Sequence, residues 1–248
     1  MRKPFFRLQP ESGIAIGPIL LVIALLAILA AAIAAGGSSY SGNTDSEKAQ
    51  AYASTVLDYA ATVSAAVARV MANGCTETQI SFENSVVTGY TNASAPSDHH
   101  CHVFDIAGGG LLWFNPPTDV LDTSNTAQYE YGHSLYQGNW GVTNLSASPL
   151  LIVFIPYVNQ ATCQKINRLL SFPVTTTSFV PWINSVHTIT QSKFTGSYVN
   201  NGSVYPDGTG CTSKCYARPA GCLWMDNWNY NATAITATGV FYKVLNFR

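Results

Sequence analysis

Charged residues are scarce in this chain. Lysine, arginine, aspartate and glutamate together make up 10% of its 248 residues, and the net charge is −1, whereas globular domains carry about 25% charged residues. Asparagine, serine, threonine and glycine supply the polarity instead. Because the sequence has no basic patch, we expect no nucleic-acid partner.

Signature motifs of common enzymes are also missing. The chain has no HExxH, phosphate-binding loop or dinucleotide fingerprint. Residues 132–136, GHSLY, begin like a hydrolase nucleophile elbow, but that motif needs a second glycine where Tyr136 stands. A cysteine nucleophile needs a reduced thiol beside a histidine, which an exported, even set of cysteines disfavours. We therefore expect neither an enzyme nor a cofactor.

One long apolar run is present near the N-terminus. Residues 14–35 contain no charge, and a helix of that length spans about 33 Å, which matches the roughly 30 Å hydrocarbon core of a bilayer. Arg2, Lys3 and Arg7 precede the run, while the charges after it are of mixed sign. This bias keeps the N-terminus in the cytoplasm and exports the rest of the chain.

Three interpretations of this run are open: a cleaved signal peptide, a plain membrane anchor, or the assembly helix of a fibre subunit. Its small C-terminal residues satisfy the rule for signal peptidase, but a signal h-region is only about 7 to 15 residues long. Length therefore favours anchoring. Small residues let helices pack closely in lipid, so we assign Ala31, Ala32, Ala35 and Gly36 to an assembly helix.

A second helical pattern follows Gly36 and Gly37, where we expect the helix to break. From residue 45 to 72, apolar residues recur at alternating spacings of 3 and 4, which predicts one amphipathic helix. Asp45 or Ser46 can cap its start, and Gly74 its end. The apolar stripe consists of Ala53, Val56, Ala60, Val63, Val67 and Val70.

Beyond Gly74 the pattern predicts a β-rich domain. TQISF, VVTGY and CHVFDI are interpreted as strands, and PLLIVFIPYV is the strongest buried strand. We expect a helix at 161–170, loops at 192–221, and one or two strands at 233–247. The predicted fold class is α+β: a long N-terminal helix, hydrophobic and then amphipathic, packs on an antiparallel β-sheet domain with disulfide-linked loops.

Six cysteines follow the apolar run, and an even number in an exported domain predicts disulfides. Fifteen pairings are possible. The pairing we prefer closes the first β-segment onto the helix end and restrains the later loops. It joins Cys75 with Cys101, Cys163 with Cys222, and Cys211 with Cys215.

Histidines cluster in SDHHCHVFD, residues 97–105, which supplies ligand types for zinc or copper. In an extended segment, His100 and His102 share one face, and His99 and Cys101 lie on the other. A disulfide at Cys101 would also remove that ligand. We interpret the segment as a polar loop leading into a strand and expect no metal, with His100 and His102 as the alternative ligands.

Aromatic residues gather in LLWFNPP, YQGNWG and CLWMDNWNYN. They form either a recognition surface or the core of the β-domain, and the average burial of tryptophan and tyrosine favours the core. The residues are Trp113, Phe114, Tyr136, Trp140, Trp224, Trp228 and Tyr230.

This order of elements resembles the type IV pilin and type II secretion pseudopilin superfamily. A short basic leader ends in glycine, and an apolar helix, its amphipathic continuation and a cysteine-bearing β-rich domain follow. ATCQKINRLLSF is similar to a Cys-x-x-Ile-Asn helix of that superfamily, with Cys163, Ile166 and Asn167 in its places. The resemblance implies that a leader peptidase cuts after Gly13 and makes Ile14 the first mature residue.

Pro18 departs from the family pattern. Five residues into the mature chain the family carries a glutamate, thought to pair with the N-terminal amine of the neighbouring subunit. Proline cannot neutralise a buried amine, although the first turn of a helix accepts it. Either another contact of the assembly helix drives assembly, or this is a divergent pilin-like protein that need not form long fibres.

The resemblance implies a leader at 1–13, a transmembrane and assembly helix at 14–37, an amphipathic continuation at 38–74 and an exported domain at 75–248. It implies a structural subunit of a type IV pilus or secretion pseudopilus, in a filament with other pilin-like subunits. Such a subunit starts in the bacterial inner membrane, with its domain in the periplasm, and ends in a filament or at the cell surface, where it serves filament contacts or adhesion. The alternative is a signal-anchored or secreted ligand-binding domain that does not polymerise.

Overall fold

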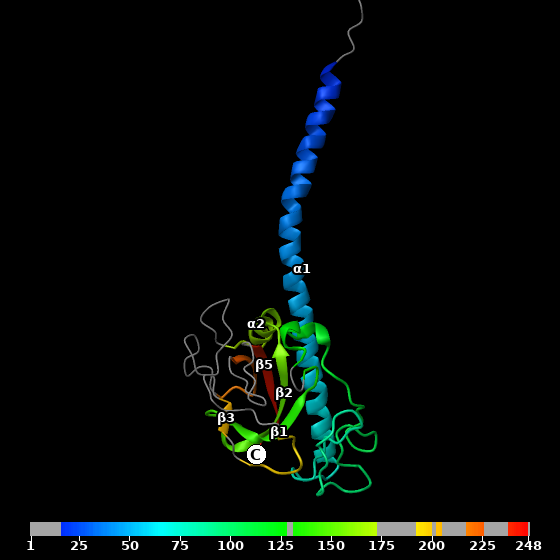
Figure 1. Cartoon of the computed structure of the whole chain (residues 1–248), viewed down its shortest axis with the longest axis vertical. Coiled ribbons are helices and arrows are strands. Elements are labelled where there is room, and N and C mark those ends of the chain that lie inside the picture. The colour runs from blue at the N-terminus through cyan, green and yellow to red at the C-terminus, as the bar shows by residue number, and fades with distance from the viewer. Residues whose placement is uncertain are drawn as a thin grey trace, which may run out of the picture. The chain divides into compact units, whose positions relative to one another are not determined.

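The chain divides into two compact units, Met1–Glu47 and Lys48–Arg248. The computed structural model describes residues 16–127, 131–172, 192–199, 202–204, 217–225 and 238–247. In the first unit the described residues are helical, and the second unit contains a β-sheet with helices (Figure 1).

Helix α1, Ile16–Ala72, is continuous. The predicted break at Gly36 and Gly37 is wrong, because a glycine inside a helix costs only about 1 kcal/mol relative to alanine and the flanking alanine, leucine and isoleucine residues are helical as well. Since no helix begins at residue 45, neither Asp45 nor Ser46 is an N-cap.

The C-terminal end of α1 is as predicted. Gly74 has a φ of +96°, and its N–H donates to the Met71 carbonyl at 3.0 Å, while the Cys75 N–H donates to the Val70 carbonyl at 3.2 Å. These two bonds form a Schellman motif, which satisfies carbonyls that the helix itself leaves free. The position favours glycine because L-residues rarely adopt positive φ.

A five-stranded sheet with the order β3-β1-β2-β5-β4 forms the centre of the second unit. Its strands are β1 (Leu135–Val142), β2 (Ser146–Val158), β3 (Gly202–Val204), β4 (Ala220–Met225) and β5 (Thr238–Asn246). β1, β2, β5 and β4 pair antiparallel, as predicted. The short edge strand β3 pairs parallel with β1, which the sequence did not indicate.

β2 confirms the strongest predicted strand, and both of its faces are buried. Leu151, Val153 and Ile155 belong to the core cluster that contains the α1 stripe. Alternate residues, such as Ile152 and Phe154, belong to a second cluster on the opposite face. Burial on both faces explains why the strand is a nearly continuous apolar run.

The α1 stripe packs into the first of these clusters. Its six residues are fully buried, which confirms the amphipathic prediction for this part of α1; they are Ala53, Val56, Ala60, Val63, Val67 and Val70. Burying an aliphatic side chain of this size stabilises a fold by about 1.5 to 3 kcal/mol. The helix is therefore an integral part of the domain core from Ala53 on.

In the part of the chain that the structure describes, three shorter helices accompany the sheet. α2, Gln160–Leu169, confirms the predicted helix, and the Asn159 side chain caps it by accepting from the Thr162 N–H at 2.9 Å. Two 3₁₀ turns, Thr118–Val120 and Thr123–Asn125, precede the sheet.

The strands predicted from TQISF, VVTGY and CHVFDI are wrong. Between residues 75 and 117 the backbone is irregular, and its described β-pairing is a single bridge from Ser81 to His102. Side chains bend this segment: Asn84 Oδ1 accepts from the Val86 and Val87 N–H groups, and Asp105 Oδ1 from the Ala107 N–H. Such Asx turns compete with strand pairing.

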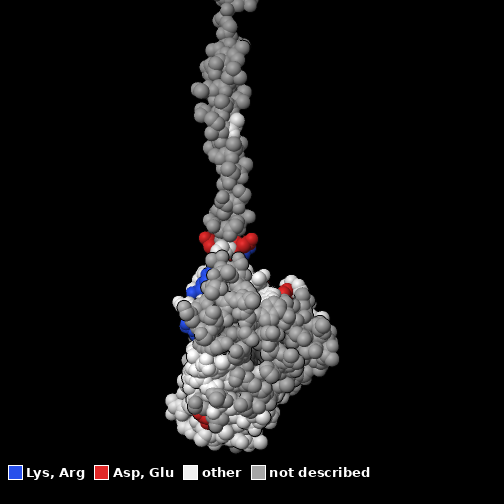
Figure 2. Space-filling view, turned by 90° about the vertical axis from the view of Figure 1, so that its left-hand side faces the viewer, with Lys and Arg blue, Asp and Glu red and all other residues white. Residues whose placement is uncertain are grey.

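Few charged side chains lie on the face shown in Figure 2, among the residues described there. This agrees with the low charge of the sequence.

Candidate functional site

A disulfide joins the end of α1 to the irregular segment that follows it. Cys75, directly after the Schellman motif, bonds to Cys101, and both are buried. The Ser81 N–H donates to the Cys101 carbonyl at 3.0 Å, and the Val103 N–H donates to the Ser81 carbonyl at 2.8 Å. The pair is the one preferred from the sequence, and backbone bonds fix the residues around it.

The histidines lie in a tight turn, and the predicted sharing of faces is wrong. His99 has a φ of +65° and its carbonyl accepts from the His102 N–H at 2.9 Å. The rings of His99 and His102 therefore stack, with centroids 4.3 Å apart and planes 4° apart. The extended geometry assumed from the sequence would have paired His100 with His102 instead.

Carboxylates form hydrogen bonds with the rings of His99 and His100. His99 Nδ1 lies 3.1 Å from Asp105 Oδ2, and His100 Nδ1 lies 2.5 Å from Asp98 Oδ1. The hydrogen bond from His100 holds the pKa of Asp98 below its usual value. Burial, followed by the nearby charge of His99, lowers the pKa of His102, so His102 favours its neutral form.

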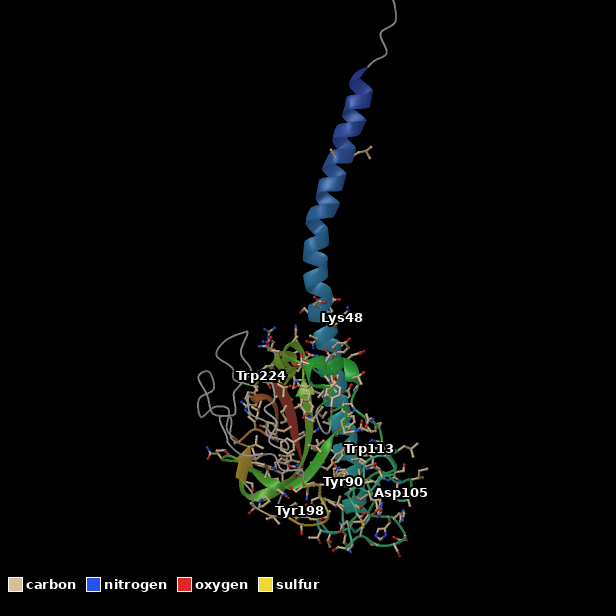
Figure 3. All side chains as sticks on the ribbon, in the orientation of Figure 1. Lys48, Tyr90, Asp105, Trp113, Tyr198 and Trp224 are labelled. Carbon is tan, nitrogen blue, oxygen red and sulfur yellow. A yellow bond between two sulfur atoms is a disulfide. The ribbon has the colours of Figure 1, made fainter. Side chains whose placement is uncertain are left out.

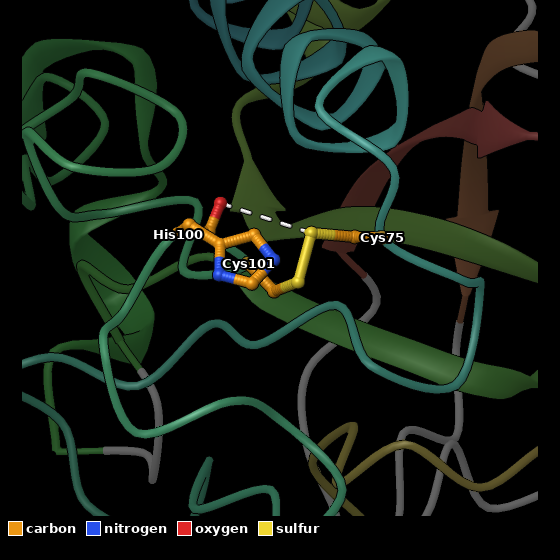
Figure 4. A group of neighbouring side chains, drawn as sticks. All are labelled: Cys75, His100 and Cys101. Carbon is orange, nitrogen blue, oxygen red and sulfur yellow. Dashed lines mark hydrogen bonds between the residues drawn. A yellow bond between two sulfur atoms is a disulfide. The ribbon is translucent and has the colours of Figure 1, made fainter.

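Cys75, His100 and Cys101 place one ligand atom each within 4.8 Å of one another (Figure 4). Among the residues that the structure describes, this is the only such group of three histidine, cysteine or acidic side chains. A cysteine binds zinc as a thiolate, and a disulfide sulfur is not a thiolate. In the oxidised protein the group is therefore a covalent link with a histidine beside it. His102, the other predicted alternative, is not a member.

The serine of GHSLY has a structural role in this arrangement. Ser134 is fully buried, and its hydroxyl donates to the Tyr59 hydroxyl at 2.6 Å. His133 points elsewhere, with Nδ1 3.0 Å from Asn115 Oδ1. A nucleophile needs a base within hydrogen-bond reach, and His133 is bonded to Asn115 instead.

Buried tyrosines connect α1 to β1 through a polar network that the sequence reasoning missed. The hydroxyls of Tyr59 and Tyr136 are 2.8 Å apart, and Tyr59 also donates to the Phe114 carbonyl at 3.3 Å. Tyr90 donates to the Ser134 carbonyl at 3.3 Å and accepts from the Tyr136 N–H at 3.2 Å. Burial raises the pKa of Tyr136 well above its usual value. A tyrosine inside an otherwise aliphatic helix stripe was the available signal.

A clamp made of Cys163, Asn167 and Cys222 fixes α2 to the edge strand β4. Cys163 forms a disulfide with Cys222, again the pair preferred from the sequence. One turn along α2, Asn167 Nδ2 donates to the Cys222 carbonyl at 2.7 Å, and Asn167 Oδ1 accepts from the Cys222 N–H at 2.8 Å. Asn167 thereby supplies the two bonds that a neighbouring strand would provide. With Ile166 fully buried, each residue of the Cys-x-x-Ile-Asn pattern has a role in packing.

Core packing accounts for much of the aromatic set. Tyr136 and Trp140 are buried, whereas Trp113, Phe114 and Trp224 are half-buried and pack against the core. Trp113 lies beside Tyr90, with ring centroids 6.3 Å apart (Figure 3). Trp228 and Tyr230 lie outside the described residues.

The predicted leader and assembly residues are only partly within the described chain. The residues of the predicted leader cut, Gly13 and Ile14, lie outside the described residues. So do the cysteines of the third predicted disulfide, Cys211 and Cys215. The backbone of α1 contains Pro18, Ala31, Ala32, Ala35 and Gly36.

The described chain contains one helical stretch long and apolar enough to cross a membrane, Asp45–Ala72. Its stripe is packed in the domain core, so its apolar character serves folding. In the first unit, Leu26 is 59% exposed.

Comparison of the chain with known protein families, curated proteins and solved structures finds no significant match. What can be said of its class therefore rests on its own residues. The described residues define an α+β protein with a long N-terminal helix, a largely antiparallel sheet and, within the described ranges, two disulfides. Disulfides are typical of domains that fold outside the reducing cytoplasm.

Proposed function

We propose that this chain is a non-enzymatic, pilin-like structural subunit that assembles into a type IV pilus or a secretion pseudopilus. The observation that carries the proposal is the continuity of α1, Ile16–Ala72. Its first part is the apolar run of the sequence, and its last part is an amphipathic stripe fixed in a domain core. One helix therefore carries both an apolar run and a stripe that belongs to a domain core, which is the arrangement that a pilin-like subunit requires.

The exposed side of α1 in the second unit supports an assembly role. Opposite the buried stripe, small side chains such as Ala61, Ala65 and Ala68 are exposed. Small residues allow neighbouring helices to approach closely. The exported domain would then provide the outer surface for filament contacts or attachment, and its disulfides would resist unfolding outside the cell.

Mass spectrometry of the mature N-terminus tests the proposal directly. We expect a chain that begins at Ile14, after removal of residues 1–13 by a leader peptidase at the inner membrane. A mature chain that begins near Ala35 or Gly36 would show that the apolar run is a cleaved signal and would exclude an assembly helix.

Pro18 favours the second candidate, a signal-anchored domain that binds a ligand and does not polymerise. It occupies the place of the glutamate that the pilin resemblance calls for. The half-buried Trp113 and its partner Asn115 would belong to the recognition surface; Trp113 Nε1 donates to Asn115 Oδ1 at 2.9 Å. An intact Met1 in the membrane fraction, with no loss of filaments on deletion, would support this candidate over the pilin-like subunit.

A further inference from the structure

We propose that reduction of the Cys75–Cys101 disulfide converts the end of α1 into a Zn²⁺ site whose ligands are Cys75, His100 and Cys101. The inference is independent of the pilin-like function. It starts from the one group of three described side chains whose ligand atoms lie within 4.8 Å of one another. Two thiolates and an imidazole are a common donor set for zinc, with a water in the fourth position.

The separations fit a tetrahedral ion after one bond has opened. Zinc binds sulfur at about 2.3 Å and histidine nitrogen at about 2.0 Å, so tetrahedral ligand atoms are roughly 3.3 to 3.8 Å apart. The His100 nitrogen already lies within 4.8 Å of both sulfurs. The two sulfurs must separate from a bond of about 2 Å to about 3.8 Å, and the His100 nitrogen must lie about 3.5 Å from each of them. Rotation about the side-chain bonds of the two cysteines can supply a movement of that size.

His100 is already oriented as a metal-bound histidine would be. Its Nδ1 is bonded to Asp98 Oδ1, and a carboxylate on one ring nitrogen leaves the lone pair of the other, Nε2, for a metal. The side chain of His100 is partly exposed, which gives an ion access. His99 also bonds to a carboxylate, that of Asp105, but its ring stacks on His102 and does not belong to the group around the two sulfurs.

Hydrogen bonds hold the backbones of both cysteines without help from the disulfide, and His100 directly precedes Cys101 in the chain. Cys75 is fixed by its bond to the Val70 carbonyl, and Cys101 by its carbonyl bond to the Ser81 N–H. The His100 carbonyl lies 3.8 Å from Cys75 Sγ, so a thiol formed there has an acceptor beside it. Reduction therefore leaves the ligands close together.

The chemistry balances with a dithiol reductant. Exchange with the dithiol breaks the Cys75–Cys101 bond, transfers two electrons and two protons to the cysteines, and leaves the reductant as a disulfide. Binding of Zn²⁺ then releases the thiol protons, because the metal ligands are thiolates. Zinc should therefore also slow reoxidation, since its thiolates are no longer free to attack a disulfide.

The second disulfide is an internal control. Reduction of Cys163–Cys222 also produces two thiols, but their polar neighbour is Asn167, whose amide is a poor zinc ligand. Among the described residues, no histidine or acidic side chain completes a group there.

Co²⁺ titration of the full chain in detergent tests the site. Cys211→Ser and Cys215→Ser are introduced first, so that the thiols come from the two described disulfides. The reduced protein should bind one Co²⁺ with a thiolate charge-transfer absorption that Zn²⁺ removes, and the oxidised protein should not. Circular dichroism of the reduced, metal-free chain verifies that the domain is folded.

Matched variants separate this site from binding by any pair of thiols. His100→Ala should lower the affinity at least about tenfold, and Asp98→Asn about tenfold, as second-shell changes do; His99→Ala should leave it unchanged. Absorption that survives Cys75→Ser with Cys101→Ser, or equal affinities of the His100→Ala and His99→Ala variants, would overturn the proposal. So would a folded, reduced chain that binds no Co²⁺.

Discussion

Asn167 replaces a neighbouring strand for one residue of β4. Its carboxamide satisfies both the N–H and the carbonyl of Cys222, and all of these groups are buried. Because β4 is at the edge of the sheet, these two groups would otherwise lack a strand partner on that side. Edge strands with free backbone groups promote aggregation, so this side chain protects the sheet as well as stabilising it.

Replacing Asn167 with alanine should reduce the free energy of unfolding by about 2 to 4 kcal/mol. Two buried backbone groups then lose their partners, and each unsatisfied group costs about 1 to 3 kcal/mol. Urea denaturation measures the change. The control is Gln160→Ala, at an exposed position of α2, where we expect a change within about 0.5 kcal/mol. Equal losses in the two variants would contradict the clamp.

Tyr59→Phe should destabilise the domain by about 1 to 3 kcal/mol, because it removes the acceptor of the buried Ser134 hydroxyl. The ring still fills its place, so the change isolates the hydroxyl. Thermal unfolding of this variant is compared with that of Tyr52→Phe, a half-buried tyrosine of the same helix. A Tyr59→Phe variant as stable as Tyr52→Phe would show that the tyrosine network is not important for stability.

At the scale of elements, long apolar patterns predicted helices and strands correctly, whereas short alternations of apolar and polar residues did not. The α1 stripe was predictable because its apolar spacing repeats over many residues, and the β2 run because it is apolar without interruption. Both are buried in the core clusters. TQISF alternates over only a few residues, and there a disulfide and Asx turns decide the backbone. The position of β3 beside β1 depends on contacts between distant segments, which no local pattern reports.

The candidate site was predictable in composition but not in geometry. The sequence singled out the histidine segment and the two cysteine pairs that the structure describes. The expectation that His100 and His102 share a face was wrong because it assumed an extended backbone. The positive φ of His99 produces the turn that stacks its ring on His102 instead. Nothing in the residue order distinguishes these two conformations.

Val63→Ala should destabilise the second unit by about 1.5 to 3 kcal/mol. Val63 is fully buried in the α1 stripe, and the change removes two methyl groups and leaves a cavity. Ala65→Ser, on the exposed side of the same helix, serves as the control and should be nearly neutral. Chemical denaturation compares the two. A neutral Val63→Ala variant would mean that the helix does not carry the core.

At the scale of the whole molecule, the buried tyrosines predict a loss of stability in alkaline solution. Burial raises the pKa of Tyr59, Tyr136 and Tyr242 in the folded state, while tyrosines of the unfolded chain titrate near about 10. Above that pH the unfolded state releases protons that the folded state keeps, so stability falls as pH rises. Below it, their contribution is fully present. Burial lowers the pKa of the half-buried Lys243. This residue therefore makes stability rise with pH, a smaller effect in the opposite direction.

Thermal unfolding between about pH 9 and pH 11 checks this expectation. The melting temperature should decline with pH, and less steeply in Tyr136→Phe than in the unmodified chain. A melting temperature that is constant across this range would contradict the assignment of buried, protonated tyrosines.

The two described disulfides should differ in their contribution to stability. The chain-entropy model gives about 4.3 kcal/mol for a loop the size of that between Cys163 and Cys222, and about 3.6 kcal/mol for the shorter one between Cys75 and Cys101. Paired alanine substitutions, measured in urea, should therefore cost more at Cys163 and Cys222. The reverse order would indicate that loop entropy does not govern these bonds.

The bond between Cys75 and Cys101 also sets how the domain responds to tension. A pull along α1 first loads the buried helix stripe. Once the stripe has left the core, the force reaches Cys75, which directly follows the helix end. The sequence separation of the two cysteines is 26, and a stretched chain of that length reaches about 90 Å. While the bond is intact, force passes directly to Cys101, and the segment between the two cysteines cannot extend. Oxidation therefore makes the chain less extensible, and reduction would let the same pull lengthen it before the sheet is loaded.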